Sequence, residues 1–276
     1  MRGYHLLLFF IVLCQSGYCQ FVDYRPVNYE FKIGNFYHMF GDRVKLRTKP
    51  NTTARVLAHL KIGDRIKIIE KMEAQMPIDG TPSNWYKVAA SGKVGFVLGS
   101  FIAVDKTSHG NTTLLIRFKR VNKAILLKTR VYKKGSIYSE SEFNLLNQTF
   151  VIRSMDNRGI DGIKSIFEID YVAYGEAIND GGMYLLCDGE KLISAIEYNQ
   201  VYFEDEYSIV EKYIFPDDKG GIPKKIIYNK ETFHKKDYET DWTERVETRR
   251  VLHWNGKAIV PKIKLEKDKD GYPIYY

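Results

Sequence analysis

The chain has 276 residues, of which 44% are hydrophobic and 28% charged, so it can bury a core and is not a disordered tail. Aromatic residues make up 14%, with 20 Tyr and 15 Phe, and this excess favours β-structure. No apolar run reaches the roughly 18 residues that cross a bilayer as a helix, so we do not expect an integral membrane protein.

The first nineteen residues have the layout of a secretory signal peptide. Arg2 supplies positive charge, Leu6 to Cys14 is an unbroken apolar run, and a short polar exit follows it. Cleavage after Cys19 would leave Gln20 as the mature N-terminus. Neither Cys14 nor Cys19 follows a small residue, which argues against a lipid anchor. We therefore expect residues 1–19 to be removed and the protein to be exported, either periplasmic or secreted.

Cleavage at this point would change the meaning of the cysteines and of the charge. Only Cys187 would remain, so the mature chain could form no internal disulfide. The net charge would fall from +8 by one unit, since Arg2 is the only formal charge removed. Lys and Arg are interrupted by acidic residues along the whole chain, and this spread argues against a nucleic-acid partner.

Residues 20–40 form a Tyr-rich lead-in, and the sequence pattern changes over residues 41–104. Short apolar runs are cut by turn signals, among them Gly63-Asp64 and Ser91-Gly92. Between them we expect a long loop that holds Met76-Pro77 and Asp79-Gly80-Thr81-Pro82. Five short strands in about sixty residues fit a small closed barrel.

The motifs in this segment carry a family resemblance. Val44–Pro50 reads V-x-L-R-x-x-P, Trp85–Val88 reads W-x-K-V, and Gly92–Val97 reads G-x-x-G-F-V, with Val56-Leu57 and Gly63 between the first two. In this order they resemble the bacterial SH3-like domain family over about residues 41–104. The resemblance implies a small β-barrel that binds cell-wall peptide or a protein partner in exported bacterial proteins.

Four residues of the barrel are candidates for ligand binding: Arg47, Trp85, Tyr86 and Phe96. Strand alternation places Tyr86 on the core side and Trp85 on the opposite face, beside the expected long loop. Two plainer interpretations stay open. Trp85 would then only close one end of the barrel, and Arg47 would only brace its turn through backbone carbonyls.

Residues 105–113 are polar and predict a linker, and residues 114–276 predict a second, larger β-rich domain. Asp188-Gly189 and Asn255-Gly256 mark two hairpins, whereas Ser139–Leu146 could form one short helix. The expected fold class is therefore mainly β: a small SH3-like barrel followed by an antiparallel β-sandwich or open barrel. This half resembles uncharacterised regions of exported Bacteroidetes proteins.

No linear pattern in the second half predicts catalysis. Cys187 follows an apolar strand and not the start of a helix, where a thiolate would be stabilised. Glu168 and Asp170 alternate with Phe167, Ile169 and Tyr171, so we expect the two carboxylates on a solvent-exposed strand face. The histidines lack metal-ligand spacing. We therefore predict no catalytic residue, no metal site and no cofactor.

Three functions remain open. The first is an exported, non-catalytic binding protein for peptidoglycan peptide or for another exported protein. The alternative is a cell-envelope hydrolase with its active site in residues 114–276, recognisable by a pocket where acidic, His or Cys side chains converge. In the third, the barrel is purely structural, with Trp85 and Tyr86 buried under the second domain.

Overall fold

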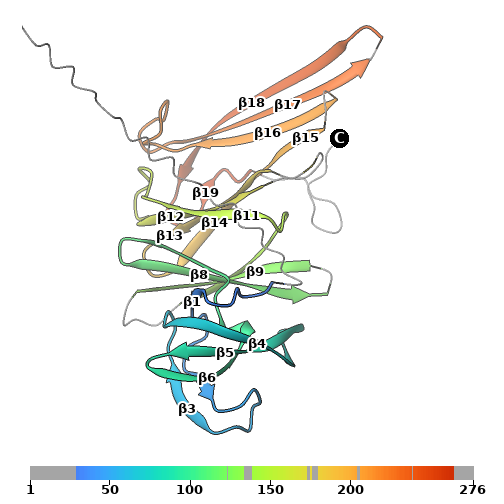
Figure 1. Cartoon of the computed structure of the whole chain (residues 1–276). Coiled ribbons are helices and arrows are strands. Elements are labelled where there is room, and N and C mark those ends of the chain that lie inside the picture. The colour runs from blue at the N-terminus through green and yellow to red at the C-terminus, as the bar shows by residue number, and fades with distance from the viewer. Residues whose placement is uncertain are drawn as a thin grey trace, which may run out of the picture.

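The computed structural model describes residues 29–263, except for 123, 134–138, 173–174, 176–179, 204–205 and 238. The expected signal peptide and the start of the lead-in lie outside the described residues. Within them the chain forms four antiparallel sheets and one 3-10 turn, η1 (Gly99–Phe101), which confirms a mainly β protein (Figure 1). No helix in the described part of the chain is long and apolar enough to cross a membrane.

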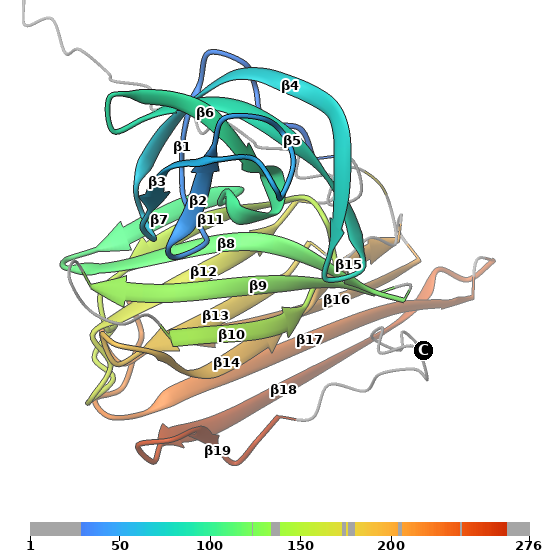
Figure 2. The ribbon, with the colours of Figure 1, turned by 90° about the horizontal axis from the view of Figure 1, so that it is seen from below.

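The first sheet is curled into a half-barrel, with strand order β1-β4-β5-β6-β2-β3 (Figure 2). Its strands are β1 (Phe36–His38), β2 (Val44–Arg47), β3 (Val56–Leu60), β4 (Arg65–Ile78), β5 (Thr81–Ala90) and β6 (Lys93–Leu98). Alternate side chains of these strands fill its core, including Leu46, Ile66 and Val88, none of which is exposed. Phe31 also lies in this core and β1 pairs with β4, so the described part of the lead-in belongs to the barrel.

The expected long loop is wrong, because these residues extend a hairpin. Strand β4 continues to Ile78, which pairs with Thr81 of β5. Asp79 and Gly80 form the turn with φ of 49° and 72°, the left-handed values that a two-residue hairpin turn of Asp-Gly type requires. The hairpin reaches beyond the barrel towards the second sheet.

The second sheet has the order β10-β9-β8-β7 and corrects two further expectations. Its strands are β7 (Asp105–His109), β8 (Thr112–Val121), β9 (Ala124–Lys133) and β10 (Ser139–Asn144). The expected linker over 105–113 is instead strand β7, its turn and the start of β8, since β7 pairs with β8 over its whole length. The expected helix over Ser139–Leu146 is instead strand β10, which pairs with β9.

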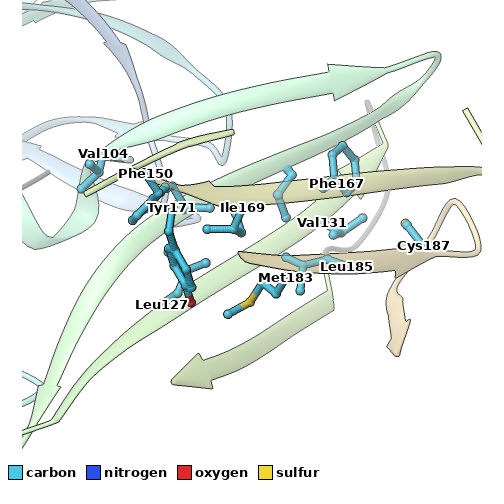
Figure 3. Close-up of a cluster of buried hydrophobic side chains, with 12 residues drawn as sticks. Val104, Leu127, Val131, Phe150, Phe167, Ile169, Tyr171, Met183, Leu185 and Cys187 are labelled. Carbon is cyan, nitrogen blue, oxygen red and sulfur yellow. The ribbon is translucent and has the colours of Figure 1, made fainter. Parts of the chain in front are cut away.

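The third sheet packs face to face on the second, and the two enclose a dry hydrophobic core. Its order is β11-β12-β13-β14, with β11 (Phe150–Met155), β12 (Ser165–Tyr171), β13 (Gly182–Cys187) and β14 (Leu192–Tyr198). Phe167, Ile169 and Tyr171 point into this core opposite Leu127 and Val131 of β9 (Figure 3). This pair of layers is the sandwich that the sequence predicts.

The fourth sheet covers the other face of the third. Its strands, in order, are β15 (Gln200–Phe203), β16 (Tyr207–Ile214), β17 (Ile226–Asp237), β18 (Trp242–Trp254) and β19 (Ile259–Val260). Ile166, Leu186 and Tyr198 of the third sheet pack here against Tyr213 and Leu252 of the fourth. Both predicted hairpins are present, as β13–β14 and β18–β19.

Candidate functional site

The half-barrel rests on the outer face of the second sheet through a small apolar cluster. Phe40 and Ala103 from the barrel side bury themselves against Leu115 of β8, and Tyr132 of β9 packs at the margin. Gly63 makes the approach possible: it has φ of +78°, and a Cβ there would overlap the Tyr132 hydroxyl. The apolar contact between the half-barrel and the second sheet is therefore small, and polar side chains make the remaining contacts.

Ion pairs clamp the tip of the β4–β5 hairpin onto the second sheet. The Asp79 carboxylate binds the Arg117 guanidinium and lies 4.0 Å from Lys128 Nζ. Burial alone would raise the pKa of Asp79, but the hydrogen bond and charge of Arg117, with Lys128 and Lys119, outweigh it and hold that pKa below its ordinary value. The ion pairs of Asp79 with Arg117 and Lys128, here called the Asp79 clasp, thus fasten the tip of this hairpin to the second sheet.

A second set of charges holds Phe40. Arg130 Nη1 donates to the Phe40 carbonyl at 2.7 Å, and its guanidinium lies 4.6 Å from the centre of the Phe40 ring. Arg130 Nε and Lys128 Nζ each lie 2.7 Å from a Glu140 carboxylate oxygen. Burial would raise the pKa of Glu140, but these two cations together lower it. Arg130, Lys128 and Glu140 are therefore all partly buried, and both cations pair with Glu140.

Two hollows remain between the half-barrel and the second sheet. The smaller, of about 400 Å³, has Trp85, Arg47 and Phe40 in its wall and collects more basic than acidic side chains. The larger, of about 540 Å³, is lined by aromatic rings, by the amides of Gln75 and Asn84, and by basic side chains. The aromatic and basic residues of the larger hollow are Tyr29, Phe31, Tyr86, Phe118, Lys71, Arg117 and Arg120.

Ser100 and Arg117 line both hollows, so the two hollows adjoin at these residues. Ser100 lies on the 3-10 turn η1, where its backbone N–H donates a hydrogen bond of 2.8 Å to Ser83 Oγ. The Ser100 hydroxyl is buried and has no hydrogen-bond partner in the described structure. A buried hydroxyl without a partner costs free energy that a polar ligand would recover.

The structure brings Trp85 and Arg47 to the same hollow. Trp85 is only 5% exposed, because its face of β5 is covered by the second sheet and not by solvent. Arg47 Nη1 donates to the Ala54 carbonyl at 2.7 Å, so it braces its turn in the way the plainer interpretation expects. Trp85 is thus buried at the junction, as the purely structural alternative expects of it, and both Trp85 and Arg47 line the smaller hollow.

Tyr86 and Phe96 occupy different places. Tyr86 is 2% exposed in the barrel core, where its ring meets Phe31 edge to face at 5.2 Å, and it reaches only the larger hollow. Burial raises the pKa of its hydroxyl. Phe96 is half-buried opposite Arg47 and Lys87 in the sheet and lines neither hollow. The four candidates therefore do not form one cluster.

Sequence reasoning missed the residues that the second sheet contributes. Arg117 lies within the apolar strand β8 and is 8% exposed. A basic residue within such an apolar run was the one sequence signal that could have indicated a functional role for it. Ser100, on the barrel side, carried no such signal, because the sequence around it does not show that its hydroxyl is buried without a partner.

Two groups with possible chemistry in the second half are structural. Cys187 is buried at the end of β13, burial raises the pKa of its thiol, and the Gly189 N–H donates to its Sγ at 3.3 Å. A protonated, enclosed thiol is a poor nucleophile. No group of three His, Cys, Asp or Glu side chains among the described residues is arranged to hold a metal ion.

The expectation that Glu168 faces solvent is wrong. Glu168 is 8% exposed because the fourth sheet covers its face of β12. Its carboxylate lies 3.5 Å from Arg153 and accepts a hydrogen bond of 3.1 Å from Tyr198 Oη. The tyrosine reaches across Gly182, where a Cβ would lie 2.7 Å from its hydroxyl. Asp170 binds the same Arg153, and burial raises the pKa of this second carboxyl.

A hollow of about 330 Å³ lies between the third and fourth sheets. Its wall is formed by β14, β16 and the β18–β19 hairpin, and Glu197 is its acidic side chain, with Lys262 as its basic one. Glu168, Asp170 and Cys187 do not line it. This hollow lacks the converging acidic, His or Cys side chains by which we expected to recognise a hydrolase.

Comparison with known proteins identifies one part of the chain. Residues 42–103 match the bacterial SH3 domain. The match has nearly the boundaries that the sequence motifs predict, and it confirms the resemblance for this segment. Neither a curated protein nor a solved structure matches the chain. The resemblance of the second half to exported Bacteroidetes proteins stays a prediction.

Proposed function

We propose that the protein is an exported, non-catalytic binding protein whose SH3-like domain, together with the second sheet, holds a cell-wall peptide. The observation that carries the proposal is the pair of adjoining hollows at the junction, with the buried Ser100 hydroxyl, which has no hydrogen-bond partner, in the lining of both. A bacterial SH3 domain favours cell-wall peptide or another exported protein as the partner.

The chemistry of the site fits a peptide with a free carboxylate. Aromatic walls such as Trp85 and Phe118 offer apolar contact, while Arg117, which is already paired with Asp79, and Arg120 are the arginines in the lining of the larger hollow. Asn84 contributes amide groups at the same wall. Concave sites with mostly apolar walls and a few fixed polar groups are the usual form of a ligand-binding pocket.

Export is the second part of the proposal, and it rests on the signal-like residues 1–19. Expression of the full chain in a bacterial host, followed by mass measurement of the exported product, tests it. We expect a chain that begins at Gln20. An uncleaved chain retained inside the cell would contradict it.

Co-sedimentation with purified peptidoglycan tests the ligand. We expect the protein from Gln20 onward to pellet, and the Trp85→Ala variant to stay in solution because it loses a wall of the hollow. Since Trp85 is buried and its loss could disturb folding, Ser100→Ala is the sharper variant. It removes a hydroxyl with no partner in the protein, so stability is unchanged while binding weakens by about two- to tenfold.

Ser91→Ala, in the exposed β5–β6 turn, is the matched control and should bind like the wild type. If the wild type does not pellet, the cell wall is removed as a ligand and an exported protein becomes the partner to seek. If Ser100→Ala binds as tightly as the wild type, the ligand does not occupy the junction.

A further inference from the structure

The β17–β18 hairpin carries an exposed strand edge that the rest of the fold does not use. In both views its distal part extends past the third sheet (Figures 1 and 2). From Trp242 to Val251 every residue of β18 except Thr248 is exposed, whichever face its side chain occupies. A strand in a covered layer would instead show buried positions at every second residue.

One side of β18 has no neighbouring strand over most of its length. It pairs with β17 on one side, but on the other β19 pairs only with His253 and Trp254. Residues 242–252 therefore present a free edge in the part of the chain that the structure describes. Such an edge is a template for pairing with another strand.

The exposed large apolar residues of this edge are unusual for a strand that should stay unpaired. Trp242 is 60% exposed and Val246 50% exposed, and they lie on the same face of the strand. Charges of both signs are interspersed along the edge: Glu244, Arg245, Glu247, Arg249 and Arg250. We propose that this edge pairs antiparallel with the same edge of a second copy, around a twofold axis at Val246.

The sequence is complementary to itself in this arrangement. With Val246 facing Val246 of the second copy, each Arg245 faces Glu247 of the second copy, and each Glu244 faces Thr248. Each Trp242 then faces Arg250, a pair suited to a cation–π contact. No like charges lie directly opposite each other.

Other registers are less favourable. An axis at Glu244, Arg245, Glu247 or Arg249 places that charged residue directly against its own copy. An axis at Thr248 would oppose Glu244 to the buried Leu252 and extend to His253, which already pairs with β19. The charge pattern thus favours a second copy as the partner, and it favours the axis at Val246 over these five other axes.

The charges are available for this contact. Arg245 lies 3.3 Å from Glu231 across the hairpin, but its side chain remains 62% exposed. Glu244 pairs with Lys236 at 3.1 Å and is 51% exposed. Pairing two copies would join their fourth sheets into one continuous sheet with a closed, isologous interface.

Sedimentation of the protein from Gln20 onward, from micromolar to hundred-micromolar concentration, tests the proposal. We expect a dimer. Arg245→Glu should raise its dissociation constant by about tenfold or more, because two carboxylates then oppose each other twice. Arg245→Glu combined with Glu247→Arg should restore the dimer. Lys257→Glu, an equal charge change in the exposed β18–β19 turn, is the control and should leave it intact.

Cysteine cross-linking tests the register. Val246→Cys places two thiols opposite each other, with Cα atoms about 5 Å apart, so oxidation should give a covalent dimer. Thr248→Cys places its two copies about 14 Å apart along the strands and should not cross-link. Cys187 is buried and does not compete. A monomeric wild type, or a dimer that survives Arg245→Glu, would overturn the proposal. Equal cross-linking at both positions would do the same.

Discussion

The second sheet has two faces, and they are covered in different ways. On the inner face, the third sheet and the second share a continuous dry core that contains Phe150, Phe167 and Leu185, all fully buried. On the outer face, the half-barrel makes a much smaller apolar contact through Phe40 and Leu115, and ion pairs and hollows occupy the rest.

This difference separates a contact built for stability from one with room for a ligand. A filled core gains dispersion and hydrophobic free energy but leaves no space. A junction held at a few apolar points and by the Asp79–Arg117 clasp leaves space between them. For this reason we place the proposed ligand on the barrel side and none in the sandwich.

The largest expected effect is at the dry face. Phe167→Ala removes a fully buried ring between the second and third sheets, and we expect a loss of about 3–5 kcal/mol of unfolding free energy. Urea unfolding followed by circular dichroism measures it.

Phe36→Ala is the matched control for this change. Its ring is 52% exposed and contacts Arg65, so its removal should cost no more than about 1 kcal/mol. Comparable losses in the two variants would mean that the sandwich core does not dominate stability.

A smaller effect should follow at the junction from Gly63→Ala. Any L-residue at φ +78° is strained, and here the new Cβ would also overlap Tyr132 and push the half-barrel away from β9. Gly92 has φ of +72° with no atom within 4 Å, so Gly92→Ala measures the backbone strain alone.

The melting temperature of Gly63→Ala should therefore lie below that of Gly92→Ala, by an amount corresponding to about 1–3 kcal/mol. Replacing Tyr132 by Ala in the Gly63→Ala background should recover part of the difference. Identical melting temperatures for the two glycine variants would show that Tyr132 does not set the junction.

The barrel could be predicted from the sequence because its motifs are local. Val44–Pro50, Trp85–Val88 and Gly92–Val97 each describe one strand or turn, and the family match covers the same segment. The β4–β5 hairpin was missed although it holds an Asp-Gly turn, because Pro77 and Pro82 argue against strands. They face each other across the hairpin, an arrangement tolerated at a non-hydrogen-bonded pair, where neither missing N–H would point at the partner.

The site could be predicted only in part, because it depends on contacts between layers. Trp85 and Arg47 were found from the barrel motifs. Arg117 and Ser100 could be recognised as site residues only once the structure showed them lining a hollow between the barrel and the second sheet. Glu168 was misjudged for the same reason: strand alternation shows which face a residue occupies but not whether another sheet covers that face.

The smallest effect concerns the Asp79 clasp and depends on pH. The pKa of Asp79 lies below its ordinary value in the folded protein, so the ion pairs contribute stability above about pH 4. That contribution is lost as the pH falls through the lowered pKa of the folded state, because the carboxylate becomes protonated and Arg117 loses its partner.

Asp79→Asn should keep the turn, since Asn tolerates the left-handed conformation at φ 49°. At neutral pH we expect a loss of only about 0–1 kcal/mol, because the Asp79 side chain is 35% exposed and solvent screens the pair. The difference in melting temperature between wild type and variant should then shrink towards pH 3. A difference that stays constant between pH 7 and pH 3 would mean that the hairpin tip is held by its shape and not by its charge.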